Sequence, residues 1–304
     1  MLKIFNHAVT FWFSTFTTSV PLPSDPTYIP SRDVSLVVPT VDTEDTFPAS
    51  LRTWASSNVK EIIIVTVPDE LERVQALVAQ ADITPTIPLR VLTCPRASKR
   101  GQMARGIREA TGRIIALSDD DISWTRTTLV HLLAPFEDAS VGGVGGRQKA
   151  ALPRSGKTWN VWEVAGAKRL WQRTRLETAN NAIDGGCMVL SGRTVLYRAE
   201  IIKDEGFLYA FTRDYWLGRY LLDSGDDTFI TRWVQANGWK IRFQSCAEAD
   251  VITSCKDTSA YNKQCIRWHR NSLRTSIRTV VYIPHILRLV ACQLSPIQIS
   301  DIYH

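Results

Sequence analysis

Arg113-Ile114-Ile115-Ala116-Leu117-Ser118-Asp119-Asp120-Asp121 is the stretch of sequence that most strongly constrains the fold. Its apolar run predicts a short buried strand at 113–117. The three acidic residues that follow would repel one another unless cations balance them. Because ligands of open α/β sheets bind outside the carboxyl ends of strands, we expect a polar site directly after this strand.

Similar apolar runs precede this stretch and alternate with segments of helical spacing. Strands that alternate with helices predict a doubly wound α/β sheet. A looser middle section follows, and helical periodicity then returns. Four prolines within 21–30 indicate an extended linker, so the folded domain is expected to begin just after it. The remaining predicted strands are 34–38, 61–67 and 89–92, and the predicted helices are 46–58, 99–110, 226–237 and 256–279.

The composition is that of a globular protein with a sizeable core, with 44% apolar and 22% charged residues in a chain of 304. The balance of 36 basic against 30 acidic residues gives a net charge of +6. This excess is too mild for a dedicated nucleic-acid binder, but it suits a protein that handles phosphates or an anionic membrane surface. The six cysteines lie far apart without a zinc-ligand spacing, so free thiols are expected.

Two apolar stretches near the ends fall short of the roughly 20 apolar residues that a membrane span requires. The segment 8–20 is interrupted by serines and threonines, and we interpret it as an interfacial or buried segment. The segment 280–294 is broken by Pro284, His285 and Arg288.

Two acidic motifs are candidates for chemistry. Asp119 and Asp121 offer hard oxygen ligands at alternate positions, which suit Mg²⁺ or Mn²⁺ bridging to a diphosphate; the alternative is an acidic loop that caps the next helix. The order Gly225-Asp226-Asp227 stands at a predicted helix start. We expect Asp226, nearer the start, to cap the helix, which leaves Asp227 to face a cleft as a proton acceptor.

A third motif places an amide, a guanidinium and an indole on one face of the basic helix. Gln264, Arg267 and Trp268 are spaced i, i+3 and i+4. A guanidinium binds phosphate bidentately and an indole stacks on a sugar ring, so the face suits a sugar-diphosphate site. The alternative is a core tryptophan beside a solvated charge. The wider basic face of this helix, at 263, 267, 270, 274 and 278, is either solvated or lies on anionic lipid.

Two glycine motifs are rejected as nucleotide sites. Gly156-Lys157-Thr158 is similar to the end of a phosphate-binding loop, but Ala151 stands where its first glycine is required. The run Gly142-Gly143-Val144-Gly145-Gly146 has Gln148 at the third glycine of a dinucleotide fingerprint, so we interpret it as a flexible turn after a strand.

The ordered set D-x-D, G-D-D and Q-x-x-R-W resembles the processive branch of glycosyltransferase family 2, which contains the hyaluronan, chitin and cellulose synthases. The resemblance covers about residues 33–274. Four further segments are similar to fungal type 2 glycosyltransferases implicated in cell-surface polysaccharide. They are V-V-P-T at 37–40, E-I-I-I-V-T at 61–66, L-S-G-R-T at 190–194 and F-T-R-D-Y-W at 211–216.

This resemblance implies an α/β GT-A fold, a Rossmann-like mixed sheet with helices on both faces, followed by a C-terminal interfacial helix. The implied domains are an apolar segment and linker at 1–32, a catalytic domain at 33–255, and the basic helix and tail at 256–304. The implied roles are uracil binding by Asp69, donor binding by Lys99, Asp119, Gln264 and Arg267, metal binding by Asp119 and Asp121, acceptor binding by Ser191, Gly192 and Trp268, and catalysis by Asp227 with Asp226 as its neighbour.

The function that the resemblance implies is inverting transfer of a sugar from a nucleoside diphosphate donor, expected to be a UDP-sugar, with Mg²⁺ or Mn²⁺. The expected acceptor is a growing polysaccharide or another carbohydrate hydroxyl in cell-wall synthesis. We expect the cytosolic face of the plasma membrane as the location. The alternative is a catalytically inactive, membrane-peripheral relative that binds a nucleotide sugar or a partner synthase.

Overall fold

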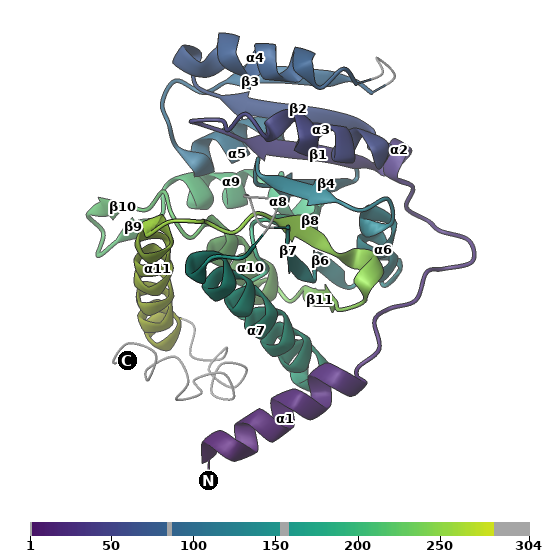
Figure 1. Ribbon diagram of the computed structural model, residues 1–304, viewed down its shortest axis with the longest axis vertical. Coiled ribbons are helices and arrows are strands. Elements are labelled where there is room, and N and C mark those ends of the chain that lie inside the picture. Colours follow the sequence, from purple (N-terminus) through teal and green to yellow (C-terminus); the bar gives the residue numbers. More distant parts are fainter. Residues whose placement is uncertain (1, 84–86, 153–157, 283–304) are drawn as a thin grey trace.

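The computed structural model describes residues 2–83, 87–152 and 158–282. A central seven-stranded mixed sheet has the order β11-β6-β8-β4-β1-β2-β3 (Figure 1). Six strands run parallel, and β8 alone runs antiparallel to its neighbours β4 and β6. The strands are β1 Val34–Pro39, β2 Glu61–Thr66, β3 Leu89–Thr93, β4 Ile114–Ser118, β6 Val141–Gly146, β8 Thr194–Arg198 and β11 Lys240–Gln244.

Helices cover both faces of this sheet, as predicted, because side chains alternate between faces along each strand. Leu36 and Val38 of β1 pack in one core with helices α3, α4 and α6, whereas Val37 packs in a second core with α5, α9 and α10. These helices are α3 Phe47–Ser56, α4 Leu71–Gln80, α5 Lys99–Glu109, α6 Thr128–Leu133, α9 Glu205–Thr212 and α10 Asp226–Ala236.

Smaller elements surround the sheet. A three-stranded sheet has the order β5-β12-β7, and β9 pairs with β10 in a short hairpin. Their bounds are β5 Ile122–Trp124, β7 Gln148–Ala150, β9 Tyr215–Trp216, β10 Tyr220–Leu221 and β12 Val251–Thr253. The short helical turns are α2 Pro30–Asp33, η1 Pro68–Glu70, η2 Ala134–Glu137, α8 Ala199–Ile202 and η3 Ala247–Ala249.

The glycine-rich run at 142–146 is a buried strand, so its interpretation as a flexible turn is wrong. A Cβ atom at Gly143 would lie 2.9 Å from Tyr197 Cε1, and one at Gly145 would lie 2.8 Å from Leu190 Cδ2. Contacts this short show why the strand is glycine-rich, since the neighbouring side chains fill the space that Cβ atoms would need.

Two long helices lie beneath the sheet in Figure 1. The helix α7, Val161–Asp184, was not predicted, and α1, Leu2–Phe16, packs against it. Arg175 of α7 holds α1 through a guanidinium 5.1 Å from the ring centre of Phe11. Phe11, Trp12 and Phe16 nevertheless remain largely exposed. None of the helices in the described residues is long and apolar enough to cross a bilayer.

The basic helix α11, Ala260–Tyr282, begins four residues later than predicted. Its basic residues do not form one uniform face. Lys263, Arg267 and Arg270 are exposed, whereas Arg274 and Arg278 turn toward the body of the protein. Arg278 ion-pairs with Asp214 at 2.6 Å, so the two interpretations as a purely solvated or lipid-facing surface are both wrong at this end.

Several sequence features lie partly or wholly outside the described residues. They are Gly156 and Lys157 of the rejected phosphate loop, most of the apolar stretch 280–294, and Cys292. The other five cysteines, Cys94, Cys187, Cys246, Cys255 and Cys265, are free thiols, as predicted.

Candidate active site

Lys99 joins the two acidic motifs, which are more than one hundred residues apart in the sequence. Its Nζ lies 2.7 Å from Asp119 Oδ1, directly after β4, and 3.1 Å from Asp226 Oδ2, at the start of α10. Burial would lower the pKa of Lys99, but the two carboxylates outweigh it and raise this pKa above its usual value. Lys99 therefore stays positively charged between them.

The side chain of Asp120 is hydrogen-bonded within the protein. Thr40, at the end of β1, donates a hydrogen bond from Oγ1 to Asp120 Oδ2 at 2.5 Å. Gln102 fixes the same strand end, since its Nε2 donates to the Thr40 and Val65 carbonyls at 2.9 and 2.8 Å. Burial raises the pKa of Asp120 to about 6. Of the three acidic residues, Asp120 is thus the one that connects the loop between β4 and β5 to the end of β1.

The other two, Asp119 and Asp121, fit a divalent cation held together with a nucleotide. Burial and then the charge of Asp119 raise the pKa of Asp121, while Arg193 and Lys256 oppose the shift. A shared cation would relieve this repulsion between the carboxylates. Within the described residues no three His, Cys, Asp or Glu side chains form a metal cluster. Asp119 and Asp121 by themselves would be enough for Mg²⁺-type ions, which take one or two carboxylates and complete their shell with phosphates and water.

The G-D-D motif is arranged differently from the prediction. Helix α10 begins after Gly225, whose φ is 76°, and no side chain caps it. Asp226 is buried against Lys99 and is not the cap, because the ammonium group offers a stronger partner than the free backbone N–H groups. Asp227 Oδ1 instead accepts from the Thr228 backbone N–H at 2.7 Å.

Asp227 has the electrostatic character of a proton acceptor. Burial, followed by the charge of Asp226, raises its pKa, and the charges of Arg173 and Lys99 oppose the rise. A general base works best when its pKa approaches the working pH. The raised pKa therefore suits the role predicted for Asp227, while Asp226 acts on it as a neighbouring charge.

Gly192, one of the two residues predicted to bind the acceptor, lies against this carboxylate pair, and Ser191 precedes it in the same loop. A Cβ at Gly192 would lie 3.4 Å from Asp226 Oδ2 and 3.6 Å from Asp227 Cβ. Ser191 is buried, and its Oγ accepts from Arg193 Nη1 at 3.3 Å. The loop that enters β8 therefore covers the catalytic candidates closely.

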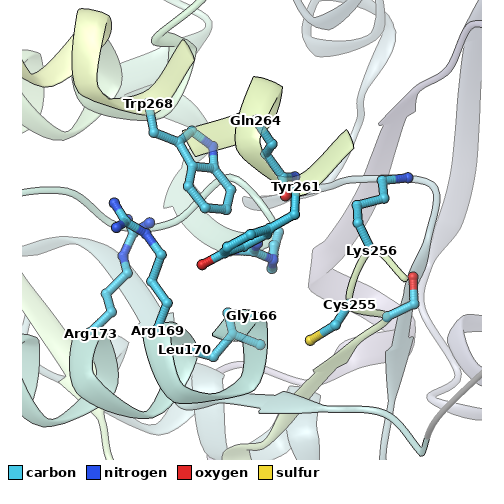
Figure 2. A pocket seen from close by; sticks show the side chains of 11 residues that line it. Gly166, Arg169, Leu170, Arg173, Cys255, Lys256, Tyr261, Gln264 and Trp268 are labelled. Atoms are coloured by element: carbon cyan, nitrogen blue, oxygen red, sulfur yellow. The ribbon is translucent and has the colours of Figure 1, made fainter. Parts of the chain in front are cut away.

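The Q-x-x-R-W motif forms one wall of a pocket between α11 and α7 (Figure 2). Gln264 and Trp268 both line it, whereas Arg267 is exposed and lies outside the lining. The guanidinium groups of Arg169 and Arg193 lie 5.1 and 5.6 Å from the ring centre of Trp268. Two of the three residues predicted on this face are thus brought together, and arginines from other elements join them.

Asp69 stands apart from the residues above. It is exposed in η1, immediately after β2. Its place at the end of a parallel strand agrees with the predicted edge of the sheet. Among the described residues, however, Asp69 forms no hydrogen bond or ion pair with Lys99 or with the acidic cluster.

Sequence reasoning gave no role to Arg100, Asp214 or Arg173. Arg100 is buried and donates to the Ser224 carbonyl at 3.1 Å, so it holds the turn that precedes Asp226. The only sequence signal for Arg100 is its place beside Lys99 at the start of a helix. Asp214 lies within F-T-R-D-Y-W, a segment that contributed to the family resemblance but had no predicted role.

Comparisons with known proteins identify the family of the chain and its fold. The model of the family described as "Glycosyltransferase like family 2" matches residues 30–271. The NDP-glycosyltransferase ltbB of Aspergillus luteorubrus is 38% identical over 286 residues, covering 93% of this chain and 69% of the relative. The chain belongs to glycosyltransferase family 2. A type 2 glycosyltransferase of Zymoseptoria tritici is 36% identical over 267 residues, covering 88% of this chain but 55% of the relative.

The fold of this family 2 glycosyltransferase matches a solved structure as well. The mannosyltransferase PcManGT from Pyrobaculum calidifontis, solved with GDP-Man and Mn²⁺, superposes with a TM-score of 0.65 at 15% identity. The match covers 96% of this chain and 78% of PcManGT. The predicted GT-A fold is therefore confirmed, and the family identifies the chain as a glycosyltransferase that binds a nucleotide-sugar donor and an acceptor. Membership of the processive branch stays a prediction.

Proposed function

We propose that this protein is an inverting glycosyltransferase that transfers a sugar from a UDP-sugar to a carbohydrate hydroxyl in cell-surface polysaccharide synthesis. The observation that carries the proposal is the position of Lys99 between Asp119 and Asp226. This contact supports the proposal because it links a residue of the predicted donor motif with a residue of the predicted catalytic motif. The chain spans 69% of one curated relative and 55% of another, so the substrates of the longer proteins enter here as part of the proposal.

The donor half of the site lies after β4. Asp119 and Asp121 would hold Mg²⁺ or Mn²⁺, and the Mn²⁺ and GDP-Man of PcManGT support this assignment. The cation would neutralise charge on the departing nucleoside diphosphate. Lys99 supplies a further fixed positive charge next to Asp119. Asp69, at the end of β2, is the candidate for the base of the nucleotide.

The acceptor half contains the proton acceptor. Asp227 takes the proton from the acceptor hydroxyl, the oxygen forms a bond to the anomeric carbon, and the nucleoside diphosphate leaves with the electrons of the broken bond. Attack from the side opposite the leaving group inverts the anomeric configuration. Gly192 lies next to the carboxylate pair, and Trp268 lines the pocket between α11 and α7.

The proposed location is the cytosolic face of a membrane. Phe11, Trp12 and Phe16 of α1 are exposed together on one short helix, and three cations at the start of α11 are exposed as well. Aromatic side chains combined with basic residues suit binding to anionic lipid.

The direct test measures release of nucleoside diphosphate from UDP-, GDP- and ADP-sugars, with and without Mg²⁺ or Mn²⁺. We expect metal-dependent turnover of a UDP-sugar, and a loss of about 100-fold or more in Asp227→Asn with donor binding retained. Metal-dependent donor binding without turnover in the unmodified protein would instead support the inactive-relative alternative. Preference for another nucleotide would overturn the UDP assignment.

A further inference from the structure

Three arginines line the pocket beside Trp268, and Figure 2 labels two of them, Arg169 and Arg173. Arg169 and Arg173 are four residues apart on α7 and therefore lie on one side of that helix. Arg193 comes from the loop that enters β8. Two separate elements, α7 and the loop before β8, thus direct three guanidinium groups to one small space.

Within the described residues none of these three guanidinium groups is in an ion pair. Arg173 donates to the Val189 carbonyl at 3.2 Å. Arg193 donates to Gln148 Oε1 at 3.0 Å and to two hydroxyl groups, of Ser191 and Thr253, at 3.3 Å. Arg169 packs on the indole of Trp268. Lys256, also in the lining, is different because Glu44 pairs with it at 3.2 Å.

This concentration of charge is unfavourable without an anion. The guanidinium groups of Arg169 and Arg193 lie 5.1 and 5.6 Å from the same ring centre of Trp268, and Arg173 lines the same pocket, so three like charges share one small space. A carboxylate carries one negative charge, whereas a phosphate monoester carries about 1.5 to 2 at neutral pH. Guanidinium groups bind phosphate oxygens through paired hydrogen bonds. The cluster therefore fits a phosphate group better than a single carboxylate.

The position of the cluster favours the acceptor over the donor. Trp268, the proposed acceptor platform, lines this pocket and Lys99 and Asp119 do not, although Gln264, which was predicted to bind the donor, also lines it. The charge of Arg173 acts on Asp227, the candidate proton acceptor, whereas the charge of Arg193 acts on Asp119 and Asp121. An anion held here would lie on the side from which the acceptor hydroxyl approaches.

We propose that Arg169, Arg173 and Arg193 bind a phosphate group carried by the acceptor. The proposal rests on the proposed function, because it assigns the acceptor class of the same site. The phosphate can belong to a glycerol phosphate headgroup or to a sugar phosphate, which share this chemistry. In either case the glycosylated hydroxyl belongs to the same molecule.

The test is titration calorimetry of the full chain at low ionic strength with inorganic phosphate, in the presence and absence of saturating UDP and Mg²⁺. We expect phosphate to bind with UDP present and to bind more tightly than acetate. Displacement of phosphate by UDP would assign the cluster to the donor and overturn the proposal. Equal binding of acetate, or no binding of phosphate, would also overturn it. Failure of UDP itself to bind would instead count against the proposed function.

Single substitutions distinguish phosphate binding by these three arginines from a general effect of positive charge. Arg169→Gln and Arg173→Gln should each weaken phosphate binding by about tenfold, the loss expected for a charge-assisted hydrogen bond, while UDP affinity is kept. Arg175→Gln is the matched control, because Arg175 lies on the same helix but packs on Phe11 and Trp171. A loss of phosphate binding in Arg175→Gln equal to that in the pocket variants would overturn the proposal. Glycerol 3-phosphate and glucose 6-phosphate, titrated in parallel, distinguish the two sources.

Discussion

Arg100 and Asp214 form an ion pair in the interior, with Arg100 Nη1 3.0 Å from Asp214 Oδ2 and only 3% of each side chain exposed. Arg100 also donates to the Ser224 and Gly225 carbonyls, at 3.1 and 3.4 Å. The other carboxylate oxygen of Asp214, Oδ1, forms an ion pair with Arg278 of α11. One buried pair therefore connects the turn before the G-D-D aspartates with the helix that carries Trp268.

Removing one partner of this pair should destabilise the protein strongly. Arg100→Met leaves Asp214 buried with a single remaining cation, and we expect a loss of about 3 kcal/mol or more in the free energy of unfolding. Urea denaturation measures it. The control is Arg105→Met, which breaks a more exposed pair with Glu109 on the same helix and should cost no more than about 1 kcal/mol. Equal losses in both variants would show that burial of the pair adds nothing.

Substitutions of the two aspartates of the G-D-D motif should have different effects on the kinetics. Asp226→Asn removes one of the two carboxylates that hold Lys99, so we expect a weaker donor interaction, seen as a raised donor KM. Asp227→Asn should lower kcat instead. Steady-state kinetics with varied donor separates the two effects. A raised donor KM in Asp227→Asn, with a lowered kcat in Asp226→Asn, would reverse the assignment.

Metal dependence should rest on Asp121 more than on Asp120. Asp121→Asn should weaken metal-dependent UDP binding by about tenfold, because one of two carboxylate ligands is lost. Asp120→Asn keeps a polar group for Thr40 and should retain most of this affinity. Calorimetry with Mg²⁺, with Mn²⁺ and with chelator makes the comparison. Unchanged affinity in Asp121→Asn would remove this residue from the metal site.

Glu61 should contribute stability that disappears in acid. Although burial raises its pKa, hydrogen bonds from Ser35, Thr111 and Arg90 outweigh burial and hold this pKa below its usual value. The folded protein then binds fewer protons than the unfolded chain, so the contribution is present above about pH 4.5 and is lost as the pH falls.

The corresponding experiment compares Glu61→Gln with the parent by urea unfolding from pH 7 to pH 3. We expect the variant to be less stable at pH 7 and the difference to shrink below about pH 4.5. Glu72→Gln, an exposed change on α4, provides the control. A difference that stays constant down to pH 3 would show that the charge of Glu61 is not involved.

Membrane binding should depend on the exposed aromatic residues of α1. The double change Trp12→Ser with Phe16→Ser removes apolar surface that would enter the lipid interface, so flotation with anionic vesicles should fall several-fold. Tyr209→Ser, an exposed aromatic change on α9, is the control. If the unmodified protein stays in the bottom fraction at low salt, the proposed location is wrong.

Local patterns were enough to predict the parallel half of the sheet. The runs that became β1 to β4 are rich in valine, isoleucine and leucine, whose strand preference needs no distant partner. The strand β6 was missed because glycines have no side chain from which burial can be predicted. Glycine is needed there because the side chains of Tyr197 and Leu190 fill the space that Cβ atoms would occupy. The helix α7 was missed since few of its 24 residues are buried, so its pattern is weakly periodic.

The site followed the same division. Asp119 and Asp227 could be named as candidates from motifs, and Lys99 from the family resemblance, but the ion pair between Lys99 and Asp226 could not be predicted. Local rules predict that an aspartate at a helix start caps the helix. Asp226 instead pairs with Lys99, which lies 127 residues earlier in the sequence. The arginines of α7 could not be placed without knowing that α7 packs beside α11.

The reversed direction of β8 decides which loops can meet. Thr194 at the beginning of β8 pairs with Ser118 at the end of β4, and the Asp119 N–H donates to the Arg193 carbonyl at 3.2 Å. A parallel β8 of five residues would carry its entrance to the opposite edge of the sheet, roughly 16 Å away. Gly192 would then no longer reach Asp226. One inverted strand thus lets the loop that enters β8 and the loop that leaves β4 share a single edge of the sheet, so that two segments far apart in the sequence are neighbours there.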